Sequence, residues 1–240
     1  MGSFINSINN QDVRTTDTTS GGTPLGTYAG TEDGRIYRFG LAGAVALAPG
    51  KFNVTPAVAA NHQNRTTTGH AVGSYSVGLN IGATAATIDQ YKDGYLTIND
   101  AAGEGITYLV EGNAVAAGSD VLTVALAEPI KVALTASTSE ATLHVNPMAS
   151  LIVSPSAIAH QVAGVNNVTV AIGEYAWFQV AGYCSVLSDG VIAKGVEGIL
   201  SDAVAGAVET RVDATLVKGV CVAIEATVDT EYRTVNLTVA

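Results

Sequence analysis

Short alternating runs of apolar and polar residues, separated by glycine-containing turns, limit most strongly how this chain can fold. Val77, Leu79 and Ile81 alternate with Ser, Gly and Asn, and the pattern returns at residues 95–99 and 106–110. Asp-Gly and Gly-x-Gly turns separate these runs. Strands of about five residues joined by such turns are typical of an antiparallel meander.

The second half of the chain has further runs that are typical of β-strands. Residues 121–126 and 175–180 are rich in β-branched or aromatic side chains, and residues 220–226 and 233–239 predict a terminal hairpin. Residues 196–208 have apolar side chains near helical spacing, but Gly198 and Gly206 each cost a helix about 1 kcal/mol relative to Ala. We therefore predict an all-β protein, with antiparallel sandwich or barrel-like β domain(s) and a flexible N-terminal arm.

Three segments are expected along the chain. Residues 1–26 form the arm, residues 27–148 a first β-rich lobe and residues 149–240 a second, with one continuous domain as the alternative. Asn146-Pro147 and Ser154-Pro155 mark the expected boundary, because the residue before a proline disfavours helix and interrupts regular structure.

The arm is polar, rich in Thr, Asn and Gly, and aperiodic. Such a segment cannot bury enough apolar surface to order itself alone, so it is interpreted as a flexible terminus or as an arm that orders against a partner. Its candidate contact residues are Phe4, Ile5, Ile8 and Arg14.

The formal net charge is −10, from 11 basic and 21 acidic residues. An acidic chain repels phosphate backbones and anionic lipid surfaces, so we expect no nucleic-acid partner and no membrane. The first residues lack a basic region followed by an apolar one, which argues against a signal peptide.

A search for chemistry returns little. There is no G-x-S-x-G, Walker A or dinucleotide-binding motif. His62 and His70 share a polar segment without a Cys or carboxylate at ligand spacing, so they are interpreted as solvated loop residues. Asp93, Asp100 and Glu104 lack the spacing of a calcium loop and are interpreted as turn residues. We expect no enzyme, no metal and no cofactor.

Cys184 and Cys221 stand singly inside apolar runs. Buried reduced thiols are the favoured interpretation, and a disulfide between neighbouring strands is the alternative. Tyr175, Trp177 and Phe178 form the most aromatic run. They fill the sheet core or, because Tyr and Trp are enriched in interfaces, form a subunit interface.

Several short runs of the sequence are similar to runs in virion structural proteins from marine tailed phages. The runs that carry the resemblance are residues 39–44, 94–105, 175–184 and 222–233. The resemblance spans about residue 27 to the end. It rests on the general residue pattern and on these runs rather than on a catalytic motif. It implies a capsid decoration (cement) protein on the virion exterior, assembled in the host cytoplasm, which binds the major capsid protein as a homotrimer.

Two other functions stay open. One is a trimeric tail or head fibre module that binds a host receptor or glycan, although no repeat of fixed period is present. The other is a secreted β-sandwich enzyme or adhesin, for which Asp93 and Glu104 would be the residues to mutate.

Overall fold

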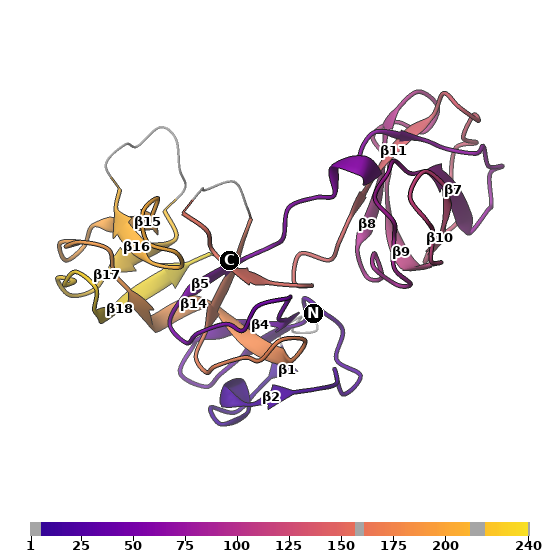
Figure 1. The fold of residues 1–240 in the computed structure, drawn as a ribbon. Coiled ribbons are helices and arrows are strands. Elements are labelled where there is room, and N and C mark those ends of the chain that lie inside the picture. Colours follow the sequence, from indigo (N-terminus) through magenta and orange to yellow (C-terminus); the bar gives the residue numbers. More distant parts are fainter. Residues whose placement is uncertain (1–5, 157–160, 212–218, 240) are drawn as a thin grey trace. The chain divides into compact units, whose positions relative to one another are not determined.

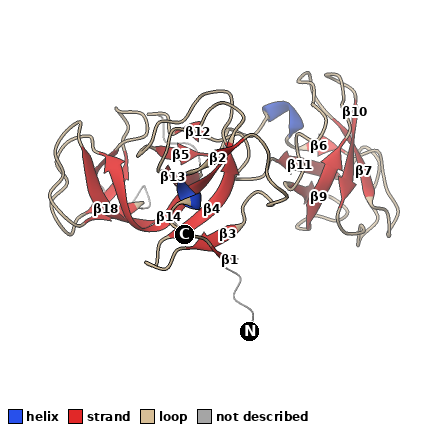
Figure 2. Ribbon diagram, turned by 90° about the horizontal axis from the view of Figure 1, so that it is seen from below, coloured by secondary structure: helices blue, strands red, loops and turns tan. Residues whose placement is uncertain are grey.

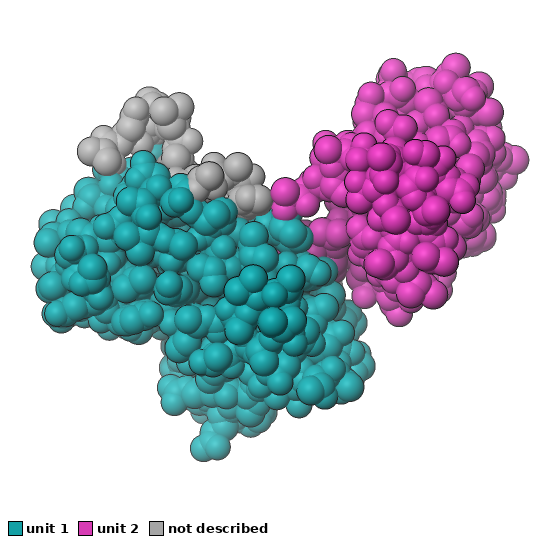
Figure 3. Space-filling model, in the orientation of Figure 1, with its two compact units in different colours: residues 1–56, 148–240 teal, residues 57–147 magenta. Residues whose placement is uncertain are grey.

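The computed structural model describes residues 6–156, 161–211 and 219–239 (Figure 1). The chain divides into two compact units (Figure 3): unit 1 comprises residues 1–56 and 148–240, and unit 2 comprises residues 57–147. Unit 2 is therefore an insertion in unit 1. The expected boundary near residue 148 coincides with one crossing between the units, but the first lobe does not extend back to residue 27. Residues 27–56 belong with the C-terminal half instead.

The prediction of an all-β fold is confirmed (Figure 2). Among the described residues the helical elements are two 3-10 turns, η1 (Asp12–Arg14) and η2 (Ala60–His62). The segment with helical spacing forms β15 (Glu197–Leu200), a turn and the start of β16 (Val208–Thr210). No helix in the described part of the chain is long and apolar enough to cross a membrane.

Unit 2 is a nearly closed antiparallel barrel. Its six strands, in the spatial order β6-β11-β8-β9-β10-β7, are β6 (Arg65–Thr66), β11 (Glu140–His144), β8 (Tyr95–Asp100), β9 (Thr107–Asn113), β10 (Val121–Leu126) and β7 (Ser76–Asn80). A bridge between Thr67 and Leu79 joins the two ends of this order. Arg65 strengthens the closure, since its Nε donates to the carbonyl oxygen of Asn80 at 3.0 Å. Of the three runs from which a meander was predicted, β8 and β9 are neighbours, whereas β7 pairs with β10 and not with β8.

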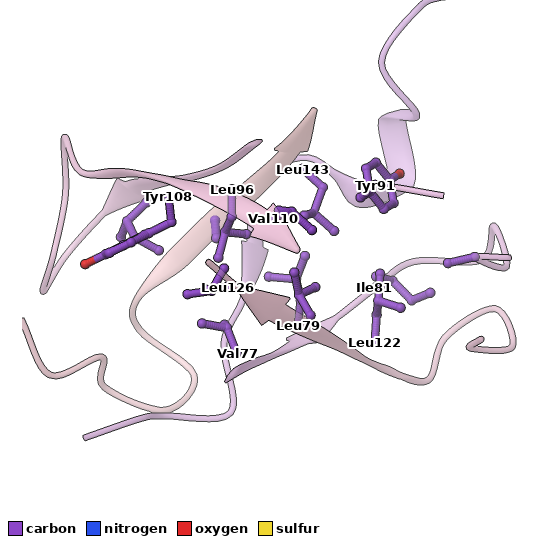
Figure 4. Close-up of a cluster of buried hydrophobic side chains, with 14 of the residues drawn as sticks. Val77, Leu79, Ile81, Tyr91, Leu96, Tyr108, Val110, Leu122, Leu126 and Leu143 are labelled. Atoms are coloured by element: carbon purple, nitrogen blue, oxygen red, sulfur yellow. The ribbon is translucent and has the colours of Figure 1, made fainter. Parts of the chain in front are cut away.

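Side chains from one face of each strand fill the barrel interior (Figure 4). Leu96 and Ile98 of β8 and Val110 of β9 are fully buried, while their sequence neighbours Tyr95 and Leu109 are exposed. A period of two therefore separates the interior from the outer surface, as the sequence pattern predicted.

Unit 1 is built on one large sheet around β14 (Tyr175–Leu187). The other strands are β1 (Asn6–Ser7), β2 (Thr16–Asp17), β3 (Tyr28–Gly30), β4 (Ile36–Leu41), β5 (Phe52–Val54), β12 (Ile152–Val153), β13 (Val162–Asn166), β17 (Cys221–Ala223) and β18 (Tyr232–Thr238), besides β15 and β16. The first half of β14 pairs with β4 and the second half pairs with β18. The terminal hairpin predicted from the sequence is confirmed as β17 and β18.

Two apolar clusters pack against the two halves of β14. Phe178 belongs to the cluster beside β4, and Val186 to the cluster that contains β17 and β18. A buried amide connects the strands: the Asn166 side chain donates to the carbonyl oxygens of Leu47, Ala48 and Val168 at 2.8–3.2 Å. The carbonyl oxygen of Leu47 already accepts from the N–H of Val170, so the amide adds to that bridge and supplies a donor to the carbonyl oxygens of Ala48 and Val168.

One turn motif recurs six times, in three nested pairs. Each copy has a residue in an isolated bridge, followed three positions later by a residue with positive φ. The bridged pairs are Leu47 with Val170, His70 with Leu134, and Ala86 with Ala116. The residues with positive φ are Gly50, Gly73, Asp89, Ser119, Ser137 and Gly173. The first pair lies in unit 1 and the other two in unit 2. Since the copies are unevenly spaced, no fixed period marks them in the sequence.

The N-terminal segment differs from the predicted flexible arm. β1 pairs with β3, β2 pairs with β14, and Val13 between them is fully buried. Backbone pairing needs no apolar side chains, so a polar segment joins the sheet although its composition indicates disorder. Of the proposed contact residues, Ile8 is half-buried and Arg14 is exposed, while Phe4 and Ile5 lie outside the described residues.

Candidate functional site

A hollow of about 490 Å³ lies on unit 1, within the described part of the chain. Its lining residues are Asp33, Arg35, Gly182, Tyr183 and Asn236. They come from the turn before β4, from β14 and from β18. The volume lies within the range of roughly 300–1,000 Å³ in which proteins hold small molecules.

Asp33 and Arg35 form a fixed ion pair at one wall of the hollow. The Arg35 Nη2 and Nε atoms lie 2.8 and 2.9 Å from Oδ2 of Asp33, and Thr31 donates its hydroxyl to Oδ1 at 2.5 Å. Arg35 also donates to Oδ1 of Asn10 at 2.5 Å. The hydrogen bonds from Arg35 and Thr31 lower the pKa of Asp33 to about 2, so the carboxylate is charged at neutral pH.

Tyr183 and Asn236 form a second wall. They are directly paired across β14 and β18, so their side chains stand on the same face of the sheet. Tyr183 is 62% exposed, which leaves its ring open to solvent.

Gly182 makes the close approach of these two walls possible. Its φ is +87°, and a Cβ at this position would lie 3.0 Å from Cγ of Arg35. A larger residue would therefore be strained in its backbone and would displace the arginine.

The aromatic run singled out in the sequence is divided between two faces. Phe178 is fully buried in the core beside β4, so it does not serve a subunit interface. Tyr175 and Trp177 point to the other face, where both rings pack on Phe39 with centroid distances of 5.6 and 5.1 Å. Both remain partly exposed. Only these two of the three residues have surface to offer a partner.

The histidines differ from the predicted solvated loop residues. His62 is fully buried in unit 2. Its Nε2 lies 2.8 Å from the carbonyl oxygen of Thr84, which can only accept, so Nε2 carries the proton and Nδ1 accepts from the Tyr91 hydroxyl. His70 is half-buried, and its Nε2 accepts from the backbone N–H of Gly78 at 2.8 Å. Both rings therefore have a structural role in unit 2, because each forms a hydrogen bond with a backbone group, the carbonyl oxygen of Thr84 or the N–H of Gly78.

Carboxylates gather at a second place on unit 1. Ser201 donates its hydroxyl to Asp189 at 2.5 Å, and burial together with the charge of Asp202 raises the pKa of Glu209. Within the described residues, no group of three or more His, Cys, Asp or Glu side chains is arranged to hold a metal ion. Asp93 adopts a φ of 58° and Asp100 caps its own turn through a bond from the N–H of Ala101, as expected for turn residues.

Sequence reasoning missed the hollow entirely. It assigned no role to Asp33 or Arg35, although Gly34 between them has the positive φ that is typical of a turn. Tyr183 follows Gly182 in a strand whose neighbouring position, Cys184, is buried. The aromatic side chain at this outward-facing position is the sequence feature that could have indicated a binding site there. Nothing in the sequence brings Asn236 to it.

Comparisons with known proteins supply no relative: no family model, no curated protein and no solved structure matches this chain.

Proposed function

We propose that this chain is a structural virion protein that binds the outside of a phage capsid and stabilises the seams between capsid subunits. The similarity of several sequence runs to virion structural proteins of marine tailed phages supports the proposal. So does the construction of the molecule, in which a β barrel is inserted by two chain crossings into a second β unit.

The observation that carries the proposal is the placement of exposed apolar side chains at the recurring turn motif. Each nested pair has two large apolar side chains within two residues of its bridged positions, all between 42% and 72% exposed. These side chains are Val45 and Ile172 on unit 1, and Val72, Val132, Ile88 and Val115 on unit 2. We call them the turn valines and isoleucines.

Separate apolar contacts on two units suit attachment to a repetitive surface. Each contact alone is small, but once one has formed, the next is effectively intramolecular and adds to the total affinity. A homotrimer at a local three-fold position of the capsid would triple the number of contacts. The net charge of −10 also keeps a chain with these exposed side chains soluble before assembly.

Electron microscopy of the intact virion tests the proposal, because density for the barrel and the larger unit is expected over seams between capsid subunits. Density for this chain on the tail alone would overturn it. Binding of the purified chain to empty capsids is the quantitative test. Replacing Val72 and Val132 by Ser is expected to weaken that binding at least tenfold and to leave the barrel folded.

A fibre module that binds a host receptor or glycan is the second candidate function. The hollow on unit 1 favours it, since a capsid clamp does not require a concave site with a charged pair.

A further inference from the structure

We propose that the hollow lined by Asp33, Arg35, Tyr183 and Asn236 binds a neutral saccharide. The inference gives a site and a ligand class to the second candidate function. It is independent of capsid attachment, which the turn valines and isoleucines would provide.

The polar wall of the hollow suits a pair of neighbouring hydroxyl groups. A sugar hydroxyl both donates and accepts, and Asp33 and Arg35 offer a fixed acceptor next to a fixed donor. Hydrogen bonds to ionised groups are stronger than those between neutral groups. Because the ion pair already holds both side chains in place, little conformational entropy is lost when a ligand binds.

The second wall, formed by Tyr183 and Asn236, suits the apolar face of a pyranose ring. The exposed Tyr183 ring has a large flat surface and loses little freedom when it is covered, since only two side-chain torsions are fixed. Asn236, directly across from it, adds an amide that both donates and accepts. Aromatic and polar groups thus converge on one space from three segments of the chain.

Charge restricts the ligand class. The carboxylate of Asp33 and the formal net charge of −10 disfavour phosphorylated, sulfated or sialylated ligands. Arg35 does not offset this effect, because Asp33 and Asn10 already occupy part of its guanidinium. Neutral hexoses remain as the ligands that match both walls.

The experiment is a glycan array of neutral and anionic saccharides probed with the full chain, followed by calorimetry with the best neutral ligand. Binding to neutral glycans is expected. Tyr183→Ala should weaken it about tenfold, while Tyr183→Phe, which keeps the ring, should retain it. Asp33→Asn should weaken binding by a similar factor because the acceptor loses its charge.

Tyr75→Ala is the matched control, because Tyr75 is 58% exposed on unit 2 and does not line the hollow. Circular dichroism of each variant establishes that it is folded. Absence of binding to any neutral glycan, a preference for anionic glycans, or equal affinity of the Tyr183→Ala and Tyr75→Ala variants would overturn the inference. Capsid binding by Tyr183→Ala should equal that of the unmodified chain, so failure of either proposal leaves the other testable.

Discussion

Cys184 and Cys221 lie on strands β14 and β17, with β18 between them in the sheet. Two strand spacings put their backbones about 10 Å apart, beyond the roughly 7 Å limit for a disulfide without backbone movement. Both are buried and free. The disulfide left open by the sequence is therefore excluded in this fold, because neither thiol stands on a neighbouring strand of the other.

Burial also raises the pKa of both thiols to about 12, which keeps them protonated and unreactive at neutral pH. We expect no reaction with iodoacetamide in the native protein and two modified cysteines after denaturation. Mass spectrometry of intact protein with and without guanidinium measures this. Rapid labelling of either cysteine under native conditions would contradict the burial described for both strands.

Replacing Tyr91 by Phe is expected to destabilise unit 2 by about 1–3 kcal/mol. The substitution keeps the ring but removes the hydroxyl that donates to Nδ1 of His62, and a buried acceptor without a partner costs about this much. Urea denaturation provides the free energy of unfolding. Tyr75→Phe, which removes an exposed hydroxyl, is the control and should change stability little. Equal stability of the two variants would show that the His62–Tyr91 contact contributes nothing.

Considered alone, Glu209 makes unit 1 more stable in mild acid than at neutral pH. Burial and the charge of Asp202 raise its pKa in the folded state above the unfolded value near 4.5. A raised pKa means that the folded state binds the proton more tightly than the unfolded state. The resulting contribution to the free energy of unfolding is fully present below the pKa of the unfolded state. It is lost as the pH rises through the pKa of the folded state.

Glu209→Gln should accordingly raise the melting temperature at pH 7 and leave it nearly unchanged at pH 4. Thermal denaturation across this range checks the difference between variant and parent. A variant that is less stable at pH 7 would mean that the carboxylate accepts hydrogen bonds of greater value than its repulsion from Asp202.

The recurring turn motif predicts opposite effects for two substitutions at equivalent positions. Ser137 holds a φ of 63° with a side chain, while Gly173 holds 72° without one. A side chain in this left-handed conformation costs about 1 kcal/mol. Ser137→Gly should therefore stabilise by somewhat less than this, since glycine adds unfolded-state entropy, and Gly173→Ala should destabilise by about 1 kcal/mol.

A Cβ on Gly173 meets no atom within 4 Å, so conformation alone decides its effect. Urea denaturation of both variants provides the comparison. Destabilisation by both would indicate that Ser137 is held by contacts that outweigh its backbone strain.

Local pattern predicted the strands well and their partners poorly. The period of two at Val77, Leu79 and Ile81 identified β7, and the Gly residues near 198 and 206 correctly argued against a helix. The pairing of β14 with β2 and of β5 with β13 joins segments more than 100 residues apart, and no local property of either segment encodes it. For the same reason the hollow was not foreseen, because Arg35 and Asn236 meet only after the sheet has formed.

The insertion of unit 2 predicts that each unit folds without the other. Val54 pairs with Ile152 across β5 and β12, so the chain leaves unit 1 and returns to it on neighbouring strands. A short flexible linker in place of residues 58–146 therefore spans the gap at little entropic cost. It also leaves Met148 in its buried position in the core of unit 1.

Residues 57–147 form a barrel whose two ends are joined at Thr67 and Leu79, so this fragment has few unpaired strand edges to expose alone. We expect both proteins to give dispersed amide spectra by nuclear magnetic resonance and cooperative unfolding transitions. An isolated fragment with the narrow dispersion of an unfolded chain would show that the barrel depends on unit 1. The paired backbones would then not be sufficient to hold its single apolar core together.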